Sequence, residues 1–160
     1  MPNYCSCRII ITGSSLPVFK KTLNTDNSSG EKVLFSFHQT VPVPDKYNGS
    51  YSDIWGTKSE GDTWMEKYVI TDDEVHIFTE TAWSIPVRWA ESCMKKYDDL
   101  HIKIAWSEAM SQHYGVWEDG NNNCIKFDDD DFKYSEEEDD YILGGNLKEH
   151  IEKYEIGLGG

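Results

Sequence analysis

The sequence has no long apolar run and few basic residues, and each shortage excludes a class of protein. No stretch of the 160 residues approaches the roughly 20 consecutive apolar residues of a membrane-spanning helix. Residues 1–8 lack the basic start and the apolar centre of a secretory signal peptide. We therefore expect a protein of the cytosol that does not associate with a membrane.

Cysteine and histidine are also scarce, with four and five residues scattered along the chain. In a reducing cytosol the cysteines are expected to be free thiols. Cys5 and Cys7 share one face of a predicted strand, but no second closely spaced Cys/His pair completes a zinc site. No nucleophile elbow, phosphate-binding loop or His-Glu-x-x-His pattern is present, and a dyad of Cys93 with His101 has no motif behind it. We predict no cofactor, no metal, no catalytic residue and no enzymatic activity.

The charge is strongly acidic and unevenly placed. Asp and Glu number 29 against 15 Lys and Arg, a net charge of −14. Residues 118–140 alone hold eleven acids and two lysines, and so carry −9 of that total. Such a surface repels phosphates, which argues against direct binding of nucleic acid. It attracts a basic protein surface instead.

Hydrophobic patterns predict alternating strands and helices. Strands are expected at residues 5–12, 68–71, 75–83, 101–106, 114–118 and 124–127, and helices at 16–24, 86–97 and 147–154. Ser14 or Ser15 is expected to cap the first helix, and Ser84 and Asn146 the other two.

Four residues recur at helical spacing and predict the inner face of the second helix: Val87, Ala90, Met94 and Tyr97. Residues 119–123 predict a hairpin turn. Residues 41–44 should form an extended loop, and residues 51–64 an ordered loop or short helix.

The element order predicts an α+β protein with a split βαβ arrangement, in which two helices cover one face of an antiparallel sheet. A C-terminal hairpin and an acidic helical extension follow. We expect one domain over residues 1–127 and an acidic C-terminal extension over residues 128–160.

Five short motifs, in order along the chain, carry a resemblance to a known family. They are Pro2-Asn3-Tyr4-Cys5-Ser6, Phe35-Ser36-Phe37, Val41-Pro42-Val43-Pro44, Trp55-Gly56-Thr57-Lys58, and Thr81-Ala82-Trp83-Ser84 followed by Pro86. Over roughly residues 2–120 the chain resembles the YubB-type ferredoxin-like proteins of bacteriophages and conjugative plasmids. The resemblance implies a ferredoxin-like fold without an iron–sulfur cluster, a mobile-element origin and action in the host bacterial cytoplasm. It implies no catalytic residue.

The acidic segment has three interpretations: a solvated stretch that maintains solubility, a nucleic-acid mimic, or a docking surface for a basic partner. Its neighbouring aromatic residues favour the last two, because aromatic side chains are typical of interfaces. The predicted partner-binding residues are Asp128, Asp129, Asp130, Asp131, Phe132, Tyr134, Glu136, Glu137, Glu138, Asp139 and Asp140.

Two further patterns have a structural and a functional interpretation. Trp55, Lys58 and Trp83 could line a ligand loop, although a buried Trp that closes the core explains Trp55 as well. Asp119 and the alternate asparagines after it imitate the start of a calcium loop. Cys124 and Asp130 then occupy positions where such a loop has Gly and Glu, so a hairpin turn is the simpler explanation.

These observations predict an accessory protein of a phage or plasmid that binds a host protein with a basic surface and modulates or inhibits it. A nucleic-acid-handling or defence protein fits the charge, as in anti-CRISPR or anti-restriction proteins and DNA mimics. The alternative is a small-molecule-binding protein or enzyme with a pocket near the Trp-rich loop. The sequence does not specify the oligomeric state.

Overall fold

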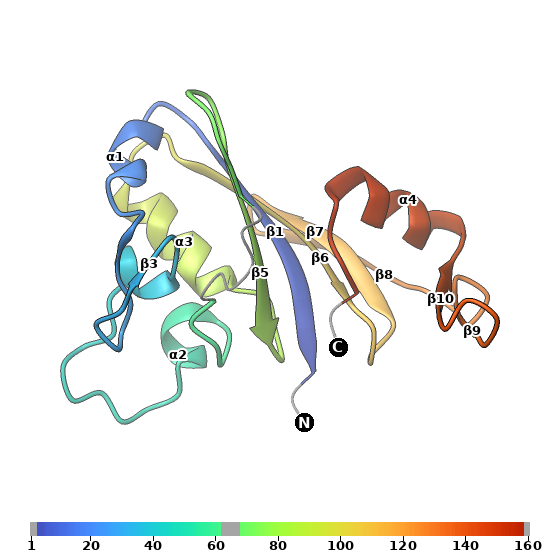
Figure 1. Cartoon of the computed structure of the whole chain (residues 1–160). Helices are drawn as coiled ribbons and strands as arrows, with labels where there is room; N and C mark the ends of the chain where they lie inside the picture. Colours follow the sequence, from blue (N-terminus) through green and yellow to red (C-terminus); the bar gives the residue numbers. More distant parts are fainter. Residues whose placement is uncertain (1–2, 62–67, 159–160) are drawn as a thin grey trace.

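The computed structural model describes residues 3–61 and 68–158, and at its centre these residues form a twisted antiparallel sheet of six strands (Figure 1). The strand order is β4-β5-β1-β6-β7-β8. The strands are β1 (Tyr4–Thr12), β4 (Tyr68–Ile70), β5 (Val75–Ala82), β6 (His101–Glu108), β7 (His113–Glu118) and β8 (Asn121–Lys126). Two small hairpins are formed by β2 (Thr25–Asp26) with β3 (Lys32–Val33), and by β9 (Phe132–Ser135) with β10 (Asp140–Leu143).

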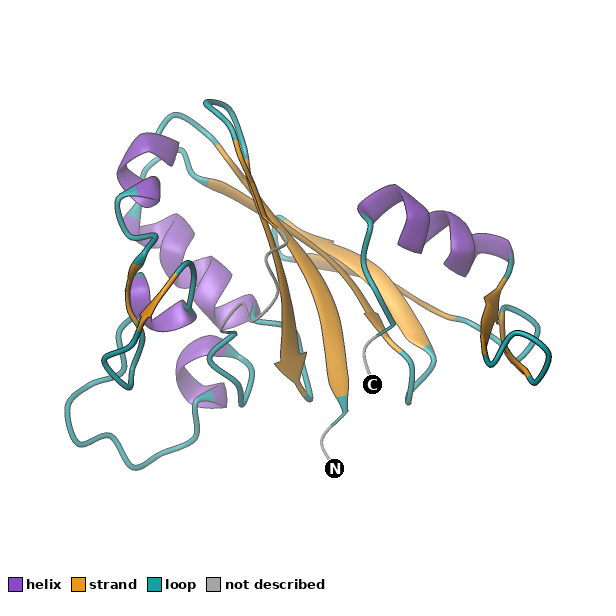
Figure 2. Cartoon of the chain, viewed as in Figure 1, coloured by secondary structure: helices purple, strands orange, loops and turns teal. Residues whose placement is uncertain are grey.

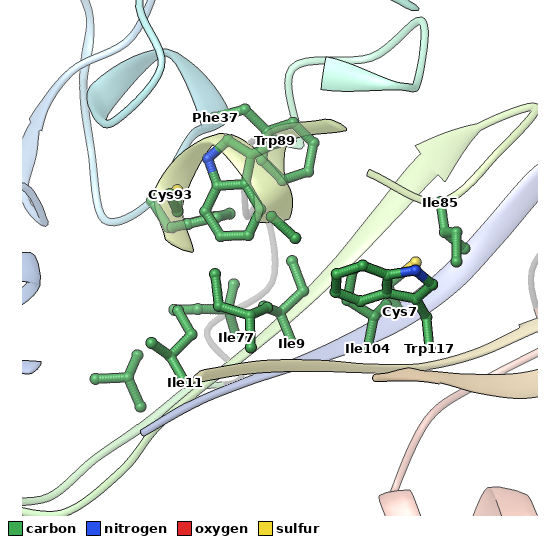
Figure 3. Close-up of a cluster of buried hydrophobic side chains, with 14 of the residues drawn as sticks. Cys7, Ile9, Ile11, Phe37, Ile77, Ile85, Trp89, Cys93, Ile104 and Trp117 are labelled. Atoms are coloured by element: carbon green, nitrogen blue, oxygen red, sulfur yellow. The ribbon is translucent and has the colours of Figure 1, made fainter. Parts of the chain in front are cut away.

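Strand β1 lies between β5 and β6, and its alternate residues Cys5, Cys7, Ile9 and Ile11 are buried in the core. Ile9 pairs with Ile77 of β5 on one side and with Ile104 of β6 on the other, and all three side chains are fully buried (Figure 3). Cys5 and Cys7 point to the same core face, as predicted, and are buried free thiols. The strands predicted near residues 5–12, 68–71, 75–83 and 101–106 are β1, β4, β5 and β6, and their pairing in one antiparallel sheet is confirmed.

Helices α1 (Leu16–Lys20), α2 (Ser52–Trp55) and α3 (Val87–Lys96) lie on one side of the sheet (Figure 2). Helix α1 lies on the connection from β1 to β4, and α3 on the connection from β5 to β6; each connection joins two parallel strands with one strand between them. Because such crossovers are right-handed, both helices cover the same face. Their buried side chains join the core cluster of β1, β5 and β6. This is the predicted split βαβ arrangement, and the α+β fold class is confirmed.

The predicted inner face of α3 does pack on the core, with Val87, Met94 and Tyr97 partly buried there, but its centre lies at Trp89 and Cys93, which were not predicted. Trp89, Ala90 and Cys93 are fully buried, and of the predicted inner residues only Ala90 is among them. The indole N–H of Trp89 donates to the Thr40 hydroxyl at 2.7 Å, and its ring packs 5.1 Å from that of Phe37. The helix therefore packs against the 3₁₀ turn η1 (Phe37–Gln39) as well as the sheet, and helical periodicity does not reveal this second partner.

Helix α1 is shorter than predicted, ending at Lys20 instead of residue 24. The Thr22 hydroxyl bonds to the carbonyl oxygen of Phe19 at 2.7 Å, which competes with continued helix. Asn24 then takes a left-handed conformation with φ 57°, and its N–H donates to Leu34. The chain thus turns at once into the β2–β3 hairpin.

The turn between β7 and β8 is also shorter than predicted. It consists of Asp119 and Gly120, with φ 51° and 80°, while Asn121 and Asn123 belong to β8. Positive φ at both central residues is the condition of a tight two-residue hairpin, and Asp-Gly meets it at low cost. The residues from Asp119 onward that resemble the start of a calcium loop therefore form a hairpin turn and the paired strand after it.

The predicted helix caps are wrong in detail. The Ser15 hydroxyl donates to the carbonyl of Asp98, and the Ser84 hydroxyl donates to the carbonyl of Gly56, so neither side chain caps its helix. The C-terminal helix has Gly144 at its N-cap instead of Asn146. The two serine hydroxyls bind carbonyl groups distant in sequence, and the N-cap of the last helix is a glycine, so none of the three helices has a side-chain cap.

Helix α4 (Gly145–Tyr154) lies on the opposite side of the sheet from α1 and α3 (Figure 1). It covers a second apolar cluster built on Tyr114, Phe127 and Leu147. The Arg8 guanidinium donates to the carbonyl of Tyr154 at 2.7 Å and so joins the end of α4 to the central strand. None of the described helices is both long and apolar enough to span a membrane.

His150 couples the packing of α4 to pH. Its Nε2 lies 3.1 Å from the carbonyl oxygen of Trp106, and its ring packs against Tyr114 and Tyr154. Burial lowers the pKa of His150 below its ordinary value of 6.5. The folded protein therefore binds this proton less well than the unfolded chain, so stability is lost as the pH falls through 6.5.

We expect the free energy of unfolding to decrease between about pH 7.5 and about pH 5.5, and to decrease less in His150→Gln. Urea unfolding followed by circular dichroism at the two pH values measures both changes. An equal loss in the wild type and in His150→Gln would contradict this assignment.

Candidate functional site

The predicted partner-binding residues fold into a structure of their own, the acidic hairpin, which we define as residues 128–143. Strands β9 and β10 pair with Tyr134 opposite Tyr141 and with Phe132 opposite Leu143. Because directly opposed residues share a face and faces alternate along a strand, these four side chains lie on one face of the hairpin. Figure 1 shows the hairpin beyond the β8 edge of the sheet, next to α4.

The base of the acidic hairpin is packed against the body of the protein. Phe132 and Leu143 are half-buried against the second apolar cluster. The ring of Phe132 lies 5.7 Å from that of Phe127 and stacks on Tyr141 at 4.3 Å with an interplanar angle of 11°. Phe132 therefore helps to anchor the hairpin, and the aromatic residues free to meet a partner are the outer ones.

The outer part of the same face exposes two tyrosines. Tyr134 is 53% exposed and Tyr141 is 50% exposed, with their rings edge to face at 5.4 Å. The Tyr134 hydroxyl donates to the Asp139 carboxylate, and this bond raises the pKa of Tyr134. The phenol thus stays neutral and holds its ring beside the acidic turn.

Carboxylates at the base of the hairpin are engaged in local bonds. Asp128 accepts the N–H of Asp130 at 2.8 Å and that of Asp131 at 3.1 Å, which closes a turn. Asp130 pairs with Lys133 at 2.8 Å; this contact lowers the pKa of Asp130 and raises that of Lys133. Asp129 accepts a bond from Gln112 at 2.8 Å.

Carboxylates at the tip have no basic partner among the described residues, although Asp139 accepts a hydrogen bond from the Tyr134 hydroxyl and Asp140 one from the N–H of Tyr141. Glu136, Glu137, Glu138, Asp139 and Asp140 are all exposed. Within residues 3–61 and 68–158, no ion pair joins any of these five to a basic side chain. The tip therefore presents uncompensated negative charge next to two exposed aromatic rings.

The three residues of the predicted ligand loop do not lie together on the surface. Trp55 is fully buried and its indole N–H donates to the carbonyl of Val41 at 2.9 Å, so it fills the core. Trp83 is 53% exposed, with a left-handed φ of 74°, and the Lys58 ammonium lies 5.4 Å from its ring. Lys58 and Trp83 meet on the surface.

Residues 60–144, more than half of the chain, match the family model described as the ferredoxin-like domain in Api92-like protein. The chain belongs to this family. No curated protein and no solved structure matches it. The matched range of the Api92-like domain includes β9 and β10, and hence the acidic hairpin. The boundary at residue 127 stays a prediction.

The buried thiols of this Api92-like protein are poorly suited to nucleophilic chemistry. Burial raises the pKa of Cys5 and of Cys93 to about 12, and also raises that of Cys7. The Cys93 thiol bonds to the Thr40 hydroxyl at 3.5 Å. Since the reactive form of cysteine is the thiolate, these three side chains act as core residues.

His101 lies between two carboxylates. Its Nε2 is 2.9 Å from Glu118 and its Nδ1 is 3.4 Å from Asp119. The predictions from sequence missed this grouping, since they considered His101 with Cys93 and Asp119 with the asparagines that follow it. The pairing register of β6 with β7 places the end of β7 beside the start of β6, and predicting that register would have brought His101 and Glu118 together.

Proposed function

We propose that this Api92-like protein is a binding protein whose acidic hairpin docks on the basic surface of another protein and modulates it. The observation that carries the proposal is the pairing of five exposed, uncompensated carboxylates with Tyr134 and Tyr141 on a hairpin whose base is packed. Charge accelerates the encounter of two proteins, and exposed aromatic side chains hold the complex after contact.

The proposal extends to the biological setting. The five sequence motifs support a YubB-type accessory protein, encoded by a phage or plasmid and active in the host bacterial cytoplasm. A basic host protein that handles nucleic acid, such as a defence nuclease, is the partner that the charge fits best. The hairpin would then occupy a groove that otherwise receives phosphates, so the protein would act as an inhibitor without binding nucleic acid itself.

A small-molecule site is the second candidate. Its support is the contact of Lys58 with the exposed Trp83, because Trp offers a large apolar face to a ligand. The burial of Trp55 removes one of its three predicted residues from the surface. The acidic hairpin therefore has the stronger claim.

The test begins with capture of host proteins on the immobilised wild type at low and high salt. For the protein recovered, Tyr134→Ala with Tyr141→Ala is expected to accelerate dissociation by about tenfold or more, because each aromatic anchor at an interface contributes of the order of 1–2 kcal/mol. Binding kinetics on a sensor surface measure the rate.

Tyr68→Ala is the matched control, since Tyr68 is 46% exposed on β4, at the opposite edge of the sheet from β8. It should leave the dissociation rate unchanged. If Tyr68→Ala weakens binding and the double variant does not, the interface lies at the β4 edge and the proposal fails. Loss of the protein partner only in Trp83→Ala would place the interface at the contact of Lys58 with Trp83 and would also contradict the proposal.

A further inference from the structure

Three residues from two strands and a turn bring different ligand groups together, away from the acidic hairpin. His101 is the first residue of β6, Glu118 the last of β7, and Asp119 the first of the two-residue turn. Ile102 and Trp117 point into the core, so alternation directs His101 and Glu118 to the opposite face of the sheet. The backbone positions are held by the β6–β7 ladder.

The potential ligand atoms lie at distances that a bound ion requires. One ligand atom from each of His101, Glu118 and Asp119 falls within 4.8 Å of the other two. The Nε2 of His101 is 2.9 Å from Oε1 of Glu118, and its Nδ1 is 3.4 Å from Oδ1 of Asp119. Ligands at about 2.0–2.2 Å from a tetrahedral ion are about 3.4 Å apart. Because an ion takes only one of the two ring nitrogens, the carboxylate beside the other nitrogen has to turn toward it, across a span of at most 4.8 Å.

The charges around His101 favour a cation. Two carboxylates contact one imidazole, and the ammonium of Lys103 lies 3.7 Å from Glu118. When the imidazole is neutral, Lys103 offsets only one of the two negative charges. A divalent ion between the three ligands removes this imbalance and accepts the imidazole lone pair.

The donor set indicates which ions fit. Calcium and magnesium prefer ligand shells made of oxygen alone, whereas an imidazole with two carboxylates suits borderline ions such as Zn²⁺, Co²⁺, Ni²⁺ or Mn²⁺. Three protein ligands leave a coordination position for water or for an external donor. All three side chains are at least partly exposed, so this position faces solvent.

We propose that His101, Glu118 and Asp119 bind one divalent transition-metal ion of the zinc class, with a position open to solvent. The site is independent of the acidic hairpin and does not rest on its proposed function. Its ligand type also differs from that of the hairpin, which offers carboxylates alone. An imidazole ligand therefore distinguishes the two.

The test is titration calorimetry of the tag-free protein with Zn²⁺, with Ca²⁺ and Mg²⁺ as comparison ions. We expect one Zn²⁺ per chain in the micromolar range and no comparable binding of the other two. His101→Ala and Asp119→Asn should each weaken Zn²⁺ binding by at least about tenfold. Asn also tolerates the left-handed conformation of position 119, so that variant keeps the turn.

Two controls separate this site from adventitious binding. His113→Ala removes a half-exposed imidazole at the other end of β7 and should not change the affinity. Lys103→Gln removes the competing ammonium and should raise the affinity several-fold, an effect that a merely structural role would not produce. Circular dichroism verifies the fold of each variant. Absence of Zn²⁺ binding, or equal binding in wild type and His101→Ala, would overturn the proposal.

Discussion

Replacing Trp89 with alanine is expected to lower the free energy of unfolding by about 3–5 kcal/mol, the largest effect of any single substitution considered. The side chain is fully buried between α3 and the sheet, 5.5 Å from the ring of Phe35 and 5.1 Å from that of Phe37 (Figure 3). Its removal leaves a cavity and deprives the Thr40 hydroxyl of its indole donor. Urea unfolding followed by far-ultraviolet circular dichroism measures the loss.

Trp83→Ala is the matched control because it removes the same atoms from a surface position. Trp83 is 53% exposed and contacts Lys58. Its change should stay within about 0.5 kcal/mol of zero, as for most surface substitutions. Equal losses at positions 83 and 89 would mean that the α3 interface does not carry the stability assigned to it.

Neutralising the acidic hairpin is expected to slow association with a basic partner by about 10–100-fold at low salt, since electrostatic steering raises association rates by 10 to 10³. The variant replaces all nine carboxylates of residues 128–131 and 136–140 with Asn or Gln. The difference from wild type should shrink as salt rises, because the Debye length falls from about 10 Å at 0.1 M to about 3 Å at 1 M. The dissociation rate should change less than the association rate.

A charge-matched control separates the position of the charges from their number. It neutralises nine exposed carboxylates outside the hairpin: Asp26, Glu31, Asp45, Asp72, Asp73, Glu80, Glu91, Asp98 and Glu149. Both variants have the same net charge, but only the hairpin variant should associate slowly. Equal slowing would assign steering to the whole surface, and unchanged association in both would leave the acidic segment as a solubility feature.

The acidic hairpin has a packed base and an exposed outer part, so residues that hold its structure can be distinguished from residues available to a partner. Phe132 belongs to its anchoring base, so Phe132→Ala would mix loss of structure with loss of contact. Tyr134 and Tyr141 lie on the outer half of the same face and can be removed with less disturbance. This distinction follows from the register of β9 and β10.

Patterns along the chain determined the sheet and the fold class. Ile9 and Ile11 of β1, and Ile102 and Ile104 of β6, stand at alternate positions and are fully buried. A one-residue shift in the pairing of either strand would turn them to the other face of the sheet. Element order then left one simple arrangement for two helices and four strands, and the matching family has the same ferredoxin-like fold. The concentration of charge in residues 118–140 is likewise a property of the sequence alone.

Tertiary contacts decided what local patterns leave open. Trp89 faces inward because it contacts Thr40 and Phe37 there, although it was not among the predicted inner residues of α3. The acidic segment forms a packed hairpin because the ring of Phe132 packs against that of Phe127. No local pattern in the segment specifies this contact. His101 meets Glu118 and Asp119 only through the pairing of β6 with β7. Contacts between residues distant in sequence depend on register and packing, so the three-dimensional fold had to supply them.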